Sequence, residues 1–124
     1  MNQKLELKLS IRLLTEDHQR CFGPGVATLL EQVAVHHSLR AAAGAMEMAY
    51  SKAWRIIRTA EEALGCKLLD STIGGKHGGG AALTPEALQL LSAYRAYQAD
   101  VEAYARQKFD SSFLELFSDP SEAK

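Results

Sequence analysis

The sequence contains little of what several classes of protein depend on. Its 124 residues include two cysteines, three prolines and one tryptophan, and aromatic residues make up 7% of the chain. A small disulfide-stabilised scaffold needs more cysteines. Cys21 and Cys66 also lack the C-x-x-C spacing of a redox or metal motif, so we expect both to be reduced, with a structural disulfide as the alternative.

Long apolar runs are also missing. No stretch approaches the roughly 18 residues that a membrane span requires, and the N-terminal MNQKLELKLS lacks the apolar region of a signal peptide. We therefore expect a cytoplasmic protein that does not associate with membranes. With 47% hydrophobic and 23% charged residues, the composition is that of a globular domain with its own core.

No charge of one sign dominates, because the net charge is −1. The distribution is uneven, however: residues 36–83 hold six basic and four acidic side chains, whereas residues 84–124 hold four basic and seven acidic ones. The positive excess in the middle of the chain is compatible with a nucleic-acid partner but does not require one.

The N-terminal third predicts a strand followed by a helix. Leucine or isoleucine at positions 5, 7, 9 and 11 alternates with polar residues, which predicts a half-buried strand. A polar turn is expected over residues 15–20. The sequence Phe22-Gly23-Pro24-Gly25 then interrupts the chain before a helix that ends near His36-His37.

A second and a third helix should follow with a turn at 47–49 between them. Ser38 is a good N-cap for the second helix, whose alanines at 42 and 43 allow close packing. The third helix is expected from about Tyr50 to Leu64, with Gly65 ending it. Its predicted core face comprises Trp54, Ile57, Ala60 and Leu64.

The rest of the chain predicts a hairpin and a long helix. Residues 67–70 and 81–83 are expected to form two strands around a glycine-rich loop at 74–80. Thr84-Pro85-Glu86 is a helix start, and the helix should run to about Lys108. Apolar residues recur along it at spacings of three and four, more than so small a core needs, which favours pairing with a second copy. A short helical turn around Phe113 and a frayed tail should complete the chain.

The order of these elements predicts a winged helix-turn-helix that binds duplex DNA. Near its start the third helix carries residues that could reach base edges or phosphates, and its outer face is cationic. The candidate DNA-binding residues are Ser38, Arg40, Tyr50, Ser51, Lys52, Arg55, Arg58, Lys76 and His77. The alternative for the helix is a solvated charged face on which Arg58 and Glu62 form an i,i+4 pair.

The glycine loop supports the same interpretation, because glycines allow a tight hairpin close to a sugar-phosphate backbone, with Lys76 and His77 at its tip. A disordered linker is the alternative. A nucleotide phosphate loop is not indicated, because His77 stands where the motif needs Ser or Thr. The histidines and cysteines have no metal-ligand spacing, and no nucleophile–base pair is evident. We expect no enzyme activity, no metal and no cofactor.

The run from Phe22 to Phe109 resembles the N-terminal DNA-binding domain of molybdate-responsive transcriptional regulators of the ModE type, which are related to LysR-type winged helices. The resemblance rests on residues 22–25, 38–43, 50–54 and above all on the glycine loop with its following Leu83-Thr84. It implies a homodimer joined largely through the first and last helices, with two recognition helices in successive major grooves. The interface residues expected on this basis are Leu29, Leu90, Tyr94, Tyr97, Val101 and Tyr104.

The sequence departs from this family in two places. Its members begin the recognition helix with Ser-Tyr-Lys or Ser-Tyr-Arg, whereas Ala49-Tyr50-Ser51-Lys52 stands here. The basic residue is thereby rotated by about 100°, so we expect an altered site preference or weaker binding. Too few residues follow Phe109 for the molybdate-binding domains, so a stand-alone regulator is expected, with molybdate not supported as its effector and any other effector unknown.

The sequence thus predicts a mainly α fold with a small β component. This fold is a winged helix-turn-helix over residues 1–110, with an N-terminal strand, a β-hairpin wing and a dimerisation helix at about 85–109, and a tail at 111–124. The predicted function is a transcriptional regulator that binds a pseudo-palindromic DNA site as a homodimer. Two alternatives are a winged-helix protein-interaction module without DNA affinity and an oxyanion-binding storage protein.

Overall fold

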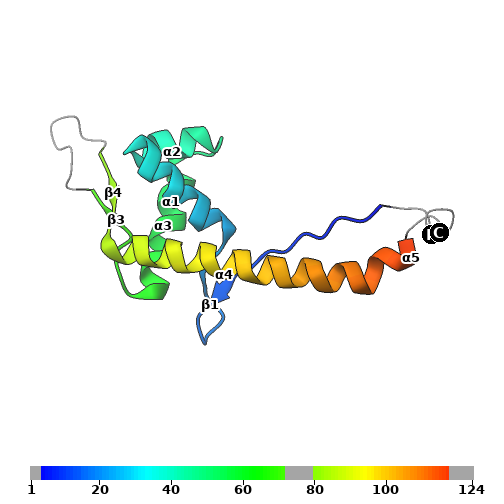
Figure 1. Ribbon diagram of the computed structural model, residues 1–124. Coiled ribbons are helices and arrows are strands. Elements are labelled where there is room, and N and C mark those ends of the chain that lie inside the picture. The colour runs from blue at the N-terminus through cyan, green and yellow to red at the C-terminus, as the bar shows by residue number, and fades with distance from the viewer. Residues whose placement is uncertain (1–3, 72–79, 118–124) are drawn as a thin grey trace. The chain divides into compact units, whose positions relative to one another are not determined.

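The computed structural model describes residues 4–71 and 80–117. Its elements, in chain order, are β1 (Leu13–Leu14), β2 (Arg20–Phe22), α1 (Pro24–His36), α2 (Leu39–Ala45), α3 (Tyr50–Leu64), β3 (Leu69–Asp70), β4 (Ala82–Leu83), α4 (Pro85–Phe109), a π-helical turn η2 (Asp110–Leu114) and α5 (Glu115–Phe117) (Figure 1). This mainly helical architecture with two small hairpins confirms the predicted fold class. Residues 10–94 form one compact unit, and the described residues 4–9 and 95–117 belong to a second.

Helix α1 supplies the centre of the larger unit. Leu29, Leu30 and Val33 on α1 are completely buried, as is Leu68 just before β3. The helix begins at Pro24, two residues earlier than the break at residues 22–25 predicts, because proline is well suited to a first helical turn. It ends where His37 adopts a left-handed conformation with φ of 57°. Helices α2 and α3 and one strand of each hairpin, β2 and β4, pack against α1.

Helices α2 and α3 approach each other through small side chains. Ala42 and Ala43 on α2 and Ala53 on α3 are at most 1% exposed. The bounds of α3 and its C-cap at Gly65 agree with the sequence prediction. The assignment of Trp54 to the core was wrong, because its side chain is 49% exposed. The buried face is shifted by one residue to Ala53, which is completely buried.

The N-terminal strand lies later in the chain than the alternating pattern predicts. Within the described part, residues 4–12 form no strand, and β1 at Leu13–Leu14 instead pairs antiparallel with β2. Leu7, Leu9 and Ile11 are nevertheless half-buried while their neighbours are exposed. The alternating sequence pattern therefore predicts the burial of alternate side chains correctly. It is not sufficient for a strand, because a strand also requires a hydrogen-bonded partner.

The wing hairpin and the long helix form at the predicted places. Strands β3 and β4 pair antiparallel with Leu69 opposite Leu83 and Asp70 opposite Ala82, and α4 begins at Pro85. The predicted turn around Phe113 is present as η2 and α5, which continue directly from α4. Among the described residues, no helix is long and apolar enough to cross a membrane.

We predict that the stability of the larger unit depends on the α1 core. Leu30→Ala should lower the free energy of unfolding by about 2–5 kcal/mol, because it removes a fully buried side chain and leaves a cavity. Chemical denaturation measures this change. Val35→Ala on the same helix, where the valine is 67% exposed, is the control and should change stability by no more than about 0.5 kcal/mol. Equal losses in the two variants would contradict the assignment.

Candidate nucleic-acid interface

Two consecutive helices joined by a tight turn form the centre of the site. The Ser38 hydroxyl accepts a hydrogen bond from the Ala41 N–H at 3.1 Å, which confirms its role as the N-cap of α2. In the turn, Glu47 has a left-handed backbone with φ of 55°, and the Met48 N–H donates to the Ala43 carbonyl at 3.0 Å. The turn thus fixes α3 against α2 and determines which face of α3 is exposed.

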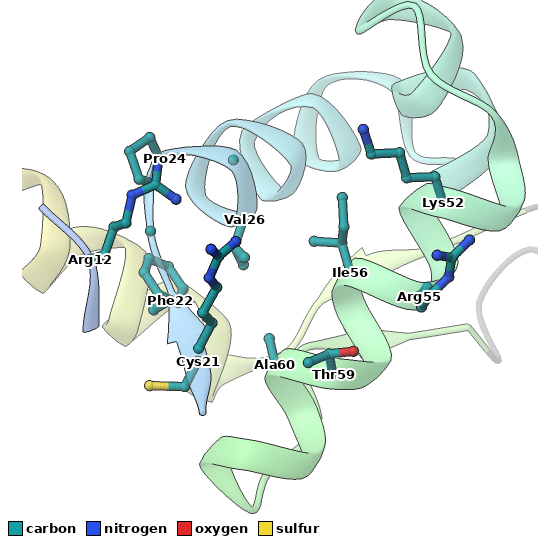
Figure 2. Close-up of a pocket in the computed structure, with 13 residues that line it drawn as sticks. Arg12, Cys21, Phe22, Pro24, Val26, Lys52, Arg55, Ile56, Thr59 and Ala60 are labelled. Atoms are coloured by element: carbon teal, nitrogen blue, oxygen red, sulfur yellow. The ribbon is translucent and has the colours of Figure 1, made fainter. Parts of the chain in front are cut away.

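The exposed face of α3 carries the predicted polar residues. Ser51, Lys52, Arg55 and Thr59 are all exposed, while Ala53, Ile57 and Ala60 face the core. Within the described residues neither Lys52 nor Arg55 has a hydrogen bond or ion pair. Figure 2 shows both side chains on α3 beside Ile56, at the edge of a cavity whose opposite side carries Arg12 and Pro24. These two cations are therefore available to an external anion.

Two aromatic rings on α3 each contact one guanidinium group. The Arg40 guanidinium on α2 lies 4.2 Å from the centre of the Tyr50 ring, and that of Arg58 lies 5.4 Å from the centre of the Trp54 ring. Such cation–π contacts orient a guanidinium without neutralising its charge. Arg40 and Tyr50, both predicted to bind DNA, are thus in contact with each other. Trp54, which was predicted to lie in the core, is instead an exposed residue of this surface.

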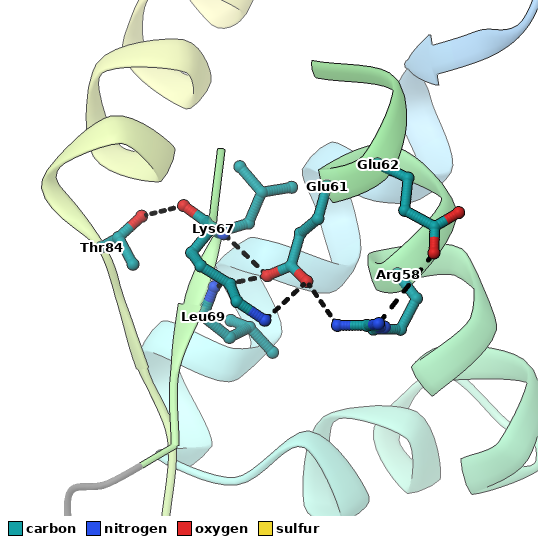
Figure 3. A network of polar contacts seen from close by, with 7 residues as sticks. Arg58, Glu61, Glu62, Lys67, Leu69 and Thr84 are labelled. Carbon is teal, nitrogen blue, oxygen red and sulfur yellow. Dashed lines mark hydrogen bonds and ion pairs between the residues drawn. The ribbon is translucent and has the colours of Figure 1, made fainter. Parts of the chain in front are cut away.

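Arg58 differs from the other cations of α3, because two carboxylates lie close to it. Its guanidinium is 3.9 Å from a Glu61 oxygen and 4.0 Å from a Glu62 oxygen (Figure 3). The i,i+4 pair that formed the alternative interpretation is therefore present for this residue. Arg58 contributes less free positive charge to the surface than Lys52 or Arg55.

Glu61 connects α3 to the wing hairpin formed by β3 and β4. Its side chain is 8% exposed, and one carboxylate oxygen accepts hydrogen bonds from the N–H groups of Leu68 at 2.8 Å and Leu69 at 3.3 Å. The other oxygen lies 3.8 Å from the Lys67 ammonium and 3.9 Å from Arg58 (Figure 3). A buried charge needs such partners to offset its desolvation. From the sequence, Glu61 is recognised only as one of the four acidic residues of 36–83.

Further hydrogen bonds hold the base of the wing. The Thr84 hydroxyl donates to the Lys67 carbonyl at 2.7 Å and accepts from the Ala87 N–H at 3.1 Å, so it joins β3 to the start of α4. The Ala81 N–H donates to the His37 carbonyl at 2.9 Å, which ties the approach to β4 to the end of α1. Lys76 and His77, the predicted wing-tip residues, lie outside the described residues.

The predicted dimer residues divide into two groups. Leu29 is completely buried and Tyr94 is 4% exposed, with its hydroxyl donating to the Ile11 carbonyl at 2.7 Å and its ring against Phe22. Both therefore stabilise the protomer and have no surface for a partner, which corrects their assignment. Tyr97 and Tyr104 are 59% and 61% exposed, whereas Leu90 and Val101 are half-buried. In the described part of the chain, no group of three or more His, Cys, Asp or Glu residues is placed to hold a metal ion.

Comparison with known proteins classifies this arrangement. A family model described as bacterial regulatory helix-turn-helix protein, lysR family, matches residues 27–88, which run from α1 through the wing to the start of α4. The molybdenum transport protein ModE of Herbaspirillum seropedicae is 37% identical over 93 residues, which are 75% of this chain and 31% of that protein. The molybdenum-pterin-binding protein MopB of Rhodobacter capsulatus is 35% identical over 94 residues, or 76% and 33% respectively. The chain thus spans about a third of the length of these relatives.

We predict that Glu61 is needed to join α3 to the wing. Glu61→Ala leaves the buried N–H of Leu68 without its acceptor, which should lower the free energy of unfolding by about 1–3 kcal/mol. Glu61→Gln keeps an acceptor oxygen, so it should lower the free energy of unfolding by less than Glu61→Ala does. Glu62→Ala is the control, because that side chain is 74% exposed. Denaturant unfolding that ranks Glu62→Ala as equally damaging would show that the link is unimportant.

Proposed function

Because the chain belongs to the LysR family of bacterial regulatory helix-turn-helix proteins, we propose that it regulates transcription by inserting α3 into the major groove of a specific DNA site. The family is one of DNA-binding regulators and not of enzymes. The observation that carries the proposal is the exposed polar face of α3, on which Lys52 and Arg55 stand without ion-pair partners among the described residues.

The dimensions and chemistry of this face suit the major groove. The groove is roughly 12 Å wide and admits one α-helix, and arginine or lysine commonly pairs with the acceptor edge of guanine. Ser51 and Lys52 lie in the first turn of α3, with Arg55 one turn later. In the proposed complex these three residues contact bases, while Arg40 on α2 and Ser38 at its cap contact phosphates. The wing at 74–80, with Lys76 and His77, is assigned to the neighbouring backbone or minor groove.

We further propose that the protein binds a pseudo-palindromic site as a homodimer paired along α4, within a functional DNA-binding unit at 1–110. The support is the repeat of Leu90, Tyr97, Val101 and Tyr104 along the helix and the exposure of both tyrosines. Two-fold symmetry of the protein then imposes two-fold symmetry on the DNA site. Since its target is the bacterial chromosome, the proposed location is the cytoplasm.

A second candidate function is a protein-interaction module that has lost DNA affinity. Two observations favour it: Ala49, the N-cap of α3, provides no side-chain hydrogen bond, and carboxylates lie close to Arg58. The unpaired Lys52 and Arg55 favour DNA instead. The names of the two relatives refer to molybdenum, but we assign no molybdate site within the described residues.

We predict that Lys52→Ala and Arg55→Ala each weaken specific DNA binding by about 1–3 kcal/mol, because each removes a contact to a base edge or phosphate. Genomic fragments retained by the protein supply the DNA, and fluorescence anisotropy measures the affinity. Lys8→Ala, an exposed lysine outside the helix-turn-helix, is the control and should bind normally. If no fragment is retained at low salt and micromolar protein, while a partner protein is bound by both alanine variants, the second function is the correct one.

We also predict that Tyr97→Asp combined with Tyr104→Asp produces a monomer, because two carboxylates would have to be desolvated in the α4 pairing surface. Analytical ultracentrifugation measures the mass of the species. Ala99→Asp is the control, since position 99 is exposed and lies on the opposite side of the helix from Tyr97 at about 100° per residue. A double variant that remains dimeric would place the interface elsewhere.

A further inference from the structure

Beside α3 lies a cavity of about 400 Å³, which is lined by the connection from β2 to α1 on one side and by α3 on the other. This volume falls within the range of pockets that hold small molecules. All of its lining residues belong to the compact unit formed by residues 10–94. The expected DNA contacts do not require a hollow at this place, so its chemistry needs a separate explanation.

The floor of the cavity is apolar. Phe22 and Ala60 are 3% and 2% exposed, Cys21 is buried, and Val26 and Ile56 are half-buried beside them. Figure 2 shows the side chains of Val26 and Ile56 between the two sides of the cavity. An inorganic anion gains nothing from such a floor, whereas an aromatic or aliphatic group removes its own surface from water by lying on it.

The rim of the cavity is cationic. Arg12 and Arg20 come from the β1–β2 hairpin and its approach, and Lys52 and Arg55 come from α3. All four are exposed, none has an ion pair within the described part of the chain, and no Asp or Glu lines the cavity. Four like charges around one hollow create a positive local field, which favours a negatively charged occupant.

From the apolar floor and the cationic rim together, we propose that this cavity binds a small organic anion, a carboxylate or phosphate monoester with an aromatic or aliphatic body, and that its binding opposes DNA binding. The opposition, which rests on the proposed function, arises because Lys52 and Arg55 belong to both surfaces. A ligand that engages them lowers the DNA affinity, and by linkage DNA lowers the affinity for the ligand.

The ligand site is tested without DNA by isothermal titration calorimetry with three probes. The first is 2-naphthoate, which has both an apolar body and a carboxylate; 2-naphthamide has the body alone and sulfate the charge alone. We expect 2-naphthoate to bind with a dissociation constant of about 1 mM or tighter and the other two to bind at least about tenfold more weakly. Equal binding of the amide would indicate a merely apolar hollow, and equal binding of sulfate a general cationic patch. Either result, or no binding of 2-naphthoate, overturns the proposal.

Variants locate the binding. Arg20→Gln should weaken 2-naphthoate binding about tenfold by removing a charged hydrogen-bond donor, and Arg12→Gln provides a second, independent test. Arg40→Gln, which makes the same change outside the cavity lining, should bind 2-naphthoate like the unaltered protein. A loss of equal size in Arg40→Gln overturns the assignment. Thermal melting of each variant confirms that the compared proteins are folded.

The proposed opposition between ligand and DNA is tested by repeating the DNA titrations in the presence of 2-naphthoate, at a concentration ten times the dissociation constant of 2-naphthoate. We expect the DNA affinity of the unaltered protein to fall several-fold and that of Arg20→Gln to fall less. Unchanged DNA affinity in the presence of bound 2-naphthoate overturns the coupling. If 2-naphthoate binds but no DNA does, the proposed function fails and the site stands. If DNA binds but 2-naphthoate does not, only the ligand proposal fails.

Discussion

The carboxylate of Glu61 is the interaction on which the geometry of the proposed DNA-binding surface depends. It lies near the end of α3, yet its hydrogen bonds go to the backbone at the start of the wing strand β3. In the proposed complex a DNA duplex contacts helix α3 and the wing simultaneously, which requires that their relative placement be fixed. Because the N–H groups of Leu68 and Leu69 are bound by one buried carboxylate, neither element can shift without leaving polar groups unsatisfied.

The same carboxylate accounts for the distribution of charge on α3. Glu61 lies next to Lys67 and Arg58, and Glu62 is also close to Arg58, so the second half of the helix is largely neutralised. Lys52 and Arg55 in the first half keep their charges. A net charge of −1 is therefore compatible with a DNA-binding surface. The electrostatic attraction of DNA to this surface depends on the local field of the unpaired cations and not on the net charge of the chain.

Much of this could be predicted from the sequence, and the failures have physical reasons. Local signals located the helices well: Ser38, Gly65 and Thr84 end or begin helices through their own backbone or side-chain bonds. Trp54 was misplaced because the spacing of apolar residues does not fix the helical phase to within one residue, and the small Ala53 takes the buried position instead. Glu61 was missed because its partners lie seven or eight residues away. The strand predicted over residues 4–12 is absent from the described structure, because a strand needs a hydrogen-bonded partner and the periodicity of the sequence does not show whether one is present.

Stability and the proposed recognition of DNA depend on different residues of the same helix. Ala53, Ile57, Ala60 and Glu61 hold α3 in place, and all are at most 8% exposed. Lys52 and Arg55 contribute little to the fold, because exposed cations interact weakly with distant charges at physiological salt, where the Debye length is about 8 Å. Like charges can therefore gather on this surface at little cost in stability. Since folding does not require them, the clustering of unpaired cations on α3 and around the neighbouring cavity supports the proposal that this surface binds anions.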